Sequence, residues 1–265
     1  MAACRIGRQQ GCRALSSPVR SPAGESAGAV DGPGPAHLRK LLAGQRHGGA
    51  LGAASKAEYP AIWSRIFANI DNVTSSSPVI TPYYGCYVLR AMATLGHRAE
   101  TLQWMRDFWG GMITEGATSF WESYDPRWTK RNFHTGLQAD GLAGYYVSLA
   151  HGWSFGPAAW LTEEVLGVRS TGAGFRTAII EPELAGLQGI EGSVPTPDGI
   201  IYVHAQRGAM TLELPAGVTA TVLLSASPDT RIDLNGAPVR TRIADVPGYR
   251  SFQISQAGRY EVVSR

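Results

Sequence analysis

The hydrophobic pattern of this chain changes from a helical to a strand-like period near residues 167–175. Before that point apolar residues recur three or four positions apart, as in amphipathic helices. After it come short β-rich runs separated by turn signals such as Pro197-Asp198-Gly199 and Asn235-Gly236. We therefore expect a helical part followed by an antiparallel β-sandwich. The predicted strands cover residues 175–180, 187–194, 199–206, 210–214, 220–224, 231–234, 250–254 and 259–263.

The helical part contains a predicted hairpin. Thr81-Pro82 predicts the start of a helix, because Thr caps helices and Pro is favoured at the first helical position. Gly96 ends this helix, and the next one starts only a few residues later. Two helices joined so closely must lie antiparallel. The predicted helices, in chain order, cover residues 57–70, 82–95, 99–112, 144–149 and 157–166.

Residues 1–55 differ from the rest of the chain. They are rich in Ala, Gly, Arg, Ser and Pro and show neither period, so we expect a disordered or non-native leader. This segment carries seven Arg and Lys residues against two acidic residues, whereas the remainder carries 17 against 19. A balanced charge on the folded part gives no footprint for nucleic acid, so no nucleic-acid partner is expected.

Several other classes of protein are disfavoured by the sequence. No apolar run is long enough for a membrane span, and the Arg-rich start lacks the apolar segment of a secretory signal. The three Cys residues imply no disulfide framework. His134 and His151 lack the paired spacing of a zinc site, so no cofactor or metal is predicted. Asn72-Val73-Thr74 matches a glycosylation acceptor, but this tripeptide is common by chance. Localisation stays open.

Five stretches between residues 57 and 210 resemble the alpha-L-rhamnosidases of glycoside hydrolase family 78. Their order and spacing make the resemblance specific. They are Thr81-Pro82-Tyr83-Tyr84, Trp109-Gly110-Gly111-Met112, Gly116-Ala117-Thr118-Ser119-Phe120-Trp121-Glu122, Ser148-Leu149-Ala150-His151-Gly152-Trp153-Ser154 and Val194-Pro195-Thr196-Pro197-Asp198-Gly199.

The resemblance implies a multi-domain α and β fold: a partial (α/α)6 six-hairpin helical barrel followed by an antiparallel β-sandwich. We place the leader at residues 1–55, the C-terminal part of the barrel at 56–170 and the sandwich at 171–265. Only four or five helices are present, so the other half of the barrel is expected to precede Ala57 and to be a missing partner of this chain.

Glu122 takes the place of the general base in this resemblance. Hydrolysis with inversion needs one carboxylic acid to protonate the leaving oxygen and a second carboxylate to activate water. In the family the general acid lies upstream, and Asp107, Asp125 and Asp140 do not match it. For a lone Glu the alternative would be a solvated loop carboxylate.

His151 is similar to the histidine that family members place in the sugar pocket, where an imidazole hydrogen-bonds to hydroxyls. A buried structural histidine is the alternative. Trp121 and Trp153 are candidate walls of the substrate site, with plain core packing nearly as well supported for each.

The resemblance implies hydrolysis of terminal non-reducing alpha-L-rhamnose residues from a rhamnose-containing glycoside or polysaccharide, with inversion. The chain is expected to be an incomplete fragment, inactive alone because the general acid is absent. One alternative is a non-catalytic carbohydrate-binding or accessory protein of the same fold. Another is a helical-barrel glycosidase that acts on other sugars.

Overall fold

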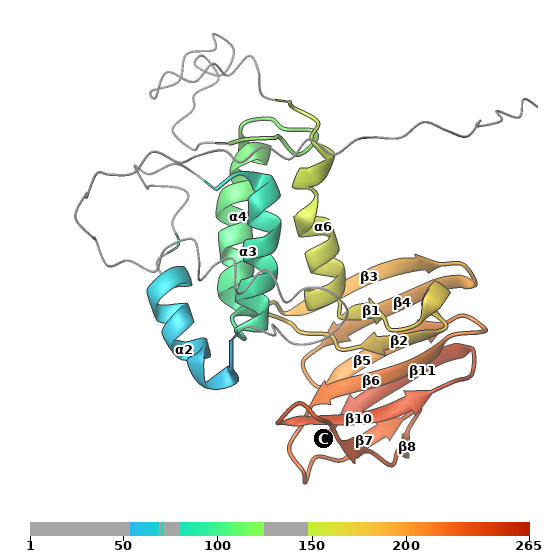
Figure 1. The fold of residues 1–265 in the computed structure, drawn as a ribbon. Coiled ribbons are helices and arrows are strands. Elements are labelled where there is room, and N and C mark those ends of the chain that lie inside the picture. The colour runs from blue at the N-terminus through green and yellow to red at the C-terminus, as the bar shows by residue number, and fades with distance from the viewer. Residues whose placement is uncertain (1–53, 69, 71–79, 125–147) are drawn as a thin grey trace, which may run out of the picture. The chain divides into compact units, whose positions relative to one another are not determined.

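The computed structural model describes residues 54–68, 70, 80–124 and 148–265 (Figure 1). Most of the predicted leader, together with Asn72-Val73-Thr74, Asp125, His134 and Asp140, lies outside the described residues. The helix predicted at residues 144–149 lies mostly outside them too. Its last two residues, Ser148 and Leu149, are described and are not helical, so that prediction is wrong there.

The first described segment is a short run of helical turns. It consists of η1 (Lys56–Glu58), α2 (Tyr59–Ile62) and η2 (Trp63–Phe67). Its start is closed by Ser55, whose backbone N–H and hydroxyl each donate to Glu58 Oε2 at 2.8 Å. Trp63 stacks on the ring of His97, with ring centroids 3.5 Å apart and planes 4° from parallel. This contact joins the segment to the turn of the predicted hairpin.

Helices α3 (Pro82–Thr94) and α4 (Arg98–Thr114) form that hairpin. Thr81 caps α3 by accepting a hydrogen bond from the Tyr84 N–H at 3.4 Å, and Pro82 is its first residue, as predicted. Gly96 has φ +90° in the turn, a conformation that favours glycine. Gly85 permits close packing, because a Cβ there would lie 2.5 Å from the Trp109 ring.

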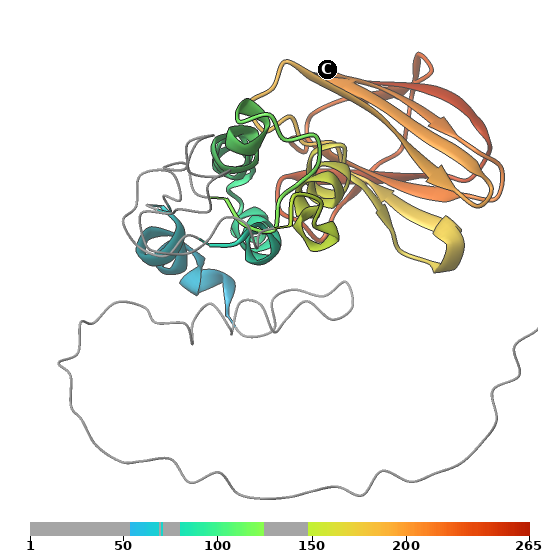
Figure 2. The ribbon, with the colours of Figure 1, turned by 90° about the horizontal axis from the view of Figure 1, so that it is seen from above.

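A third helical element packs against α3. It consists of η4 (Gly152–Ser154), α6 (Gly156–Trp160) and η5 (Leu161–Val165). Helices α3, α4 and α6 lie side by side in both views (Figure 1 and Figure 2). Trp160 is 1% exposed and its indole N–H donates to Leu89 O at 3.0 Å. A Cβ at Gly156 would come within 2.1 Å of Cys86 Sγ, so α6 approaches α3 without an intervening side chain.

Two β-sheets follow, and their buried residues belong to one core. One sheet has the order β1-β2-β6-β10-β9 and the other β3-β4-β5-β11-β7-β8. The strands are β1 (Val168–Ser170), β2 (Thr177–Ile180), β3 (Gly189–Thr196), β4 (Gly199–Gln206), β5 (Ala209–Leu214), β6 (Thr219–Ser225), β7 (Ile232–Leu234), β8 (Ala237–Pro238), β9 (Arg242–Ile243), β10 (Tyr249–Ile254) and β11 (Gly258–Ser264). A single 3-10 turn, η6 (Ala173–Phe175), lies between β1 and β2.

The sandwich confirms the predicted architecture with one difference. The described strands pair antiparallel except β2 and β6, which pair in parallel. The chain passes through β3, β4 and β5 of the other sheet between these two strands. A connection of that length allows a parallel pair, whereas a tight hairpin does not. Alternating residues fill the core, as in β5, where Met210, Leu212 and Leu214 are buried.

Candidate functional site

Backbone pairing brings the predicted carboxylate and the predicted histidine onto neighbouring segments. The N–H of Glu122 donates to Ser148 O at 2.8 Å, and the N–H of His151 donates to Phe120 O at 2.8 Å. Residues 120–122 therefore run alongside residues 148–151, although they are far apart in the sequence. The loop after α4 is fixed against the segment that leads into η4.

The carboxylate of Glu122 is held by the same pairing. Its Oε2 accepts a hydrogen bond from the Ser148 N–H at 3.0 Å, and the side chain is half-buried. A backbone N–H that donates to a carboxylate oxygen fixes the direction of the side chain. The arrangement therefore supplies an oriented carboxyl group at a partly exposed position.

His151 lies next to an aromatic patch, which we define as Tyr83, Tyr84, Tyr87 and Trp153. The His151 ring meets Trp153 edge to face, with centroids 5.7 Å apart. Trp153 is 70% exposed and tilts against Tyr83 at 5.3 Å. The hydroxyls of Tyr83 and Tyr87 lie 3.2 Å apart, and this hydrogen bond raises the pKa of Tyr87. Exposed rings with hydroxyl groups can stack on a sugar and bind its hydroxyls.

Cys86 links the Trp153 backbone to α3. Its Sγ lies 3.3 Å from Pro82 O and 3.4 Å from Trp153 O, and either oxygen can accept a hydrogen bond from the thiol. Burial raises the pKa of this thiol, so it remains a donor. The next residue is held as well: the buried indole N–H of Trp109 donates to Ser154 O at 3.1 Å. The backbone of residues 153–154 is thereby fixed on α3 and α4.

The two candidate tryptophans lie in different surroundings. Trp121 is 7% exposed and packs in the core, where its ring centroid lies 6.1 Å from that of Tyr124. Trp153 is the exposed one and adjoins His151. Asp107 is exposed on α4 and accepts a hydrogen bond from Gln103 Nε2 at 2.8 Å, as expected for a solvent-facing residue.

Tyr83, Tyr84 and Tyr87 are not among the candidate site residues predicted from the sequence. Their spacing was a usable signal, because positions 83, 84 and 87 share one side of the first turns of α3. Large aromatic side chains at an exposed helix start are not needed for a core. Tyr84 is 51% exposed.

Within the ranges that the structure describes, no three His, Cys, Asp or Glu residues are grouped so as to hold a metal ion. Over the same residues, no helix combines the length and the apolar character that a membrane crossing requires.

Comparison with known proteins finds a family-model match in the C-terminal part of the chain. Residues 167–237 match the model of the bacterial alpha-L-rhamnosidase C-terminal domain. A curated alpha-L-rhamnosidase from Alteromonas sp. (strain LOR) is 38% identical over 97 residues, which cover 36% of this chain and 10% of that protein. The chain thus spans about a tenth of this relative.

Two solved structures share the fold. The alpha-L-rhamnosidase of Streptomyces avermitilis, solved as a complex with L-rhamnose, superposes with a TM-score of 0.61 at 19% identity, over 86% of this chain and 21% of that one. The enzyme from Dictyoglumus thermophilum gives a TM-score of 0.56 at 17% identity, over 69% and 20%. The chain resembles the alpha-L-rhamnosidases, as its motifs predict, and its residues 167–237 match their bacterial C-terminal domain.

Proposed function

We propose that this chain is the C-terminal part of a glycoside hydrolase that removes terminal non-reducing alpha-L-rhamnose residues from glycosides or polysaccharides with inversion. Its helices belong to an (α/α)6 barrel whose first half lies outside this chain. The match to the alpha-L-rhamnosidase C-terminal domain and the similarity to a curated alpha-L-rhamnosidase support this assignment.

The observation that carries the proposal is the position of Glu122. Its carboxylate is fixed by the Ser148 N–H, and its segment pairs with the one that holds His151. In an inverting mechanism this carboxylate removes a proton from the attacking water. The general acid stands about 6.5–9.5 Å away on the other side of the sugar and comes from the missing half of the barrel. The isolated chain is therefore inactive.

The neighbouring side chains bind the sugar in this proposal. His151 hydrogen-bonds to a rhamnose hydroxyl, and the exposed ring of Trp153 contacts the apolar face of the sugar. Trp121 has a structural role in this proposal, because its buried ring anchors the Glu122 loop in the core. To form a wall of the site, Trp121 would need one face of its ring turned toward the substrate.

The test is a panel of aryl glycosides given to the longer protein that contains this chain. We expect hydrolysis of the aryl alpha-L-rhamnoside and release of the inverted sugar first, observed by proton NMR of the anomeric signals. Preference for a glucoside or uronide would contradict the substrate assignment, and a retained anomer would contradict the mechanism. Sugar binding without turnover would favour the accessory-protein alternative.

A further inference from the structure

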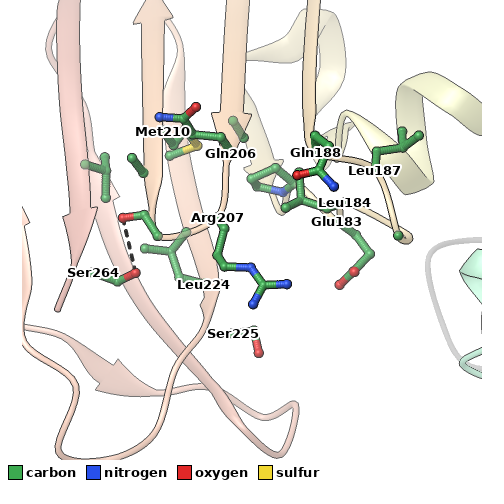
Figure 3. Close-up of a pocket in the computed structure, with 16 residues that line it drawn as sticks. Glu183, Leu184, Leu187, Gln188, Gln206, Arg207, Met210, Leu224, Ser225 and Ser264 are labelled. Atoms are coloured by element: carbon green, nitrogen blue, oxygen red, sulfur yellow. Dashed lines mark hydrogen bonds between the residues drawn. The ribbon is translucent and has the colours of Figure 1, made fainter.

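A hollow lies at one end of the sandwich, and the proposed catalytic role does not use it. Its volume is about 530 Å³, within the range of small-molecule sites. Four segments surround it: residues 182–188, the β4–β5 turn, the end of β6 and the end of β11 (Figure 3). We call it the sandwich pocket.

Both walls of the sandwich pocket are fixed by backbone hydrogen bonds. On one side, Gly208 has φ +76° in the β4–β5 turn, and its carbonyl accepts from the Ser264 N–H at 2.9 Å. On the other side, the Glu183 N–H donates to Val165 O at 2.9 Å, and the Leu187 N–H donates to Leu184 O at 2.8 Å. The pocket is therefore preformed, which lowers the entropic cost of binding.

One wall holds a strained residue. Ala185 has φ +48°, in the left-handed region that side chains with a Cβ disfavour. The next residue is a glycine with φ +85°, so the turn that closes the 182–188 wall has two successive positive φ values. Backbone strain of this kind concentrates at binding sites, where the surrounding structure maintains it.

The floor and rim of the pocket differ in chemistry. The floor is apolar: Met210 and Val262 are buried there, with Leu224 beside them. The rim carries exposed polar side chains, namely Gln188, Gln206, Arg207 and Ser225. In Figure 3 the Arg207 side chain extends into the hollow, toward Glu183 and Ser225. No carboxylate among the described residues forms an ion pair with Arg207.

Glu183, together with Arg207, determines which ligand charge the pocket accepts. Its carboxylate lines the same hollow and is held by the Ala185 N–H at 3.3 Å and the Tyr249 hydroxyl at 3.5 Å. An anionic ligand would meet this carboxylate, and a cationic one would meet Arg207. A neutral ligand whose groups both donate and accept hydrogen bonds satisfies both residues. Sugar hydroxyls do so, and the C–H face of a sugar suits the apolar floor.

We propose that the sandwich pocket is a binding site for a neutral sugar residue, separate from the site at Glu122. The sugar hydroxyls contact Arg207, Glu183 and the Gln188 amide, and its apolar face lies on Leu224 and Met210. The site would hold a saccharide chain on the sandwich through a sugar residue at a different position in that chain from the residue that is cleaved.

The experiment titrates the nitrogen-15-labelled 265-residue chain with four methyl glycosides and follows backbone amide shifts. Three probes are neutral: methyl alpha-L-rhamnoside, methyl beta-D-glucoside and methyl beta-D-galactoside. The fourth, methyl beta-D-glucuronide, is an anionic match for the glucoside. We expect saturable shifts in residues 183–188 and 206–208 with at least one neutral probe, and weaker binding of the glucuronide than of the glucoside.

Arg207→Ala should weaken binding roughly tenfold or more, as expected for loss of a charged hydrogen bond. Gln188→Ala should weaken it less, and Arg240→Ala, which removes an exposed arginine outside the pocket, should leave it unchanged. The amide spectrum of each variant shows whether it folds. Absence of saturable shifts with all neutral probes, equal binding by Arg207→Ala, or tighter binding of the glucuronide would overturn the proposal. Glu122→Gln should not change sugar binding at the sandwich pocket. Failure of this proposal can therefore be told apart from failure of the catalytic assignment.

Discussion

Glu122 and Ser148 form a reciprocal pair: the Glu122 N–H donates to Ser148 O at 2.8 Å, and the Ser148 N–H donates to Glu122 Oε2 at 3.0 Å. One residue thus fixes both the backbone and the carboxylate of the proposed base. The pair also positions the segment that continues to His151 and Trp153.

Ser148→Pro removes the N–H that holds the Glu122 carboxylate. A hydrogen bond to a charged group contributes about 1.5–3 kcal/mol. In the proposed longer protein we expect kcat to fall roughly ten- to a hundredfold. Ser148→Ala keeps both backbone bonds and serves as the control, with kcat near that of the wild type. Equal kcat values for the two variants would show that the N–H does not orient the carboxylate.

Gly85→Ala and Gly110→Ala make the same change in α3 and α4 with opposite expected results. A Cβ at Gly85 would lie 2.5 Å from the Trp109 ring, whereas at Gly110 it meets nothing within 4 Å. We expect Gly85→Ala to lower the free energy of unfolding by about 1–3 kcal/mol. Gly110→Ala should raise it by up to about 1 kcal/mol through helix propensity. Urea unfolding of this chain measures both, and a neutral Gly85→Ala would disprove the close α3–α4 approach.

Trp160→Ala tests the contact between α6 and α3. Trp160 is buried and donates to Leu89 O, so its removal should cost about 3–5 kcal/mol. Trp153→Ala removes an exposed ring and should change the free energy of unfolding by only about 0.5 kcal/mol. Denaturant titration of both variants provides the comparison. Similar losses for the two would contradict the structure around Trp153.

Tyr249 gives the sandwich a predictable response to alkaline pH. Burial, followed by the nearby Glu183 and Glu181 carboxylates, raises the pKa of this phenol above its ordinary 10.0. The folded protein therefore keeps the proton when the unfolded chain loses it, and the stabilisation is present below pH 10 and lost as the pH rises through the folded pKa. Urea unfolding between pH 8 and 11 should show a smaller alkaline loss for Tyr249→Phe than for the wild type. Parallel curves would contradict this.

The sequence predicts the elements that have a clear period or a strong start signal. The strand predicted at 199–206 is β4 with the same bounds, and the capped helix at Thr81-Pro82 is α3. Strands β1, β8 and β9, each of two or three residues, are missing from the prediction, because no alternating run marks them in the sequence. The pairing of Glu122 with Ser148 was also beyond the sequence, since the hydrogen bonds join residues 26 positions apart.

The resemblance named Glu122, His151 and two tryptophans, but composition alone could not sort the tryptophans. Trp121 and Trp153 look equivalent in the sequence because each stands in a Gly- and Ser-rich stretch. The structure buries one and exposes the other. The burial of a side chain depends on which distant segments of the chain pack against it, and no local sequence pattern encodes this. The sandwich pocket is likewise formed by four segments that only the fold brings together.

The most direct measurement is the hydrolysis rate of an aryl alpha-L-rhamnoside by the proposed longer protein with Glu122→Gln. Gln keeps the shape of the side chain and cannot accept a proton from water. Glu115→Gln, the same change at another half-buried glutamate near the end of α4, is the control. We predict a fall in kcat of at least about a thousandfold for Glu122→Gln, with unchanged folding and near-normal activity of Glu115→Gln. A Glu122→Gln variant that hydrolyses the substrate at close to the wild-type rate would contradict the account.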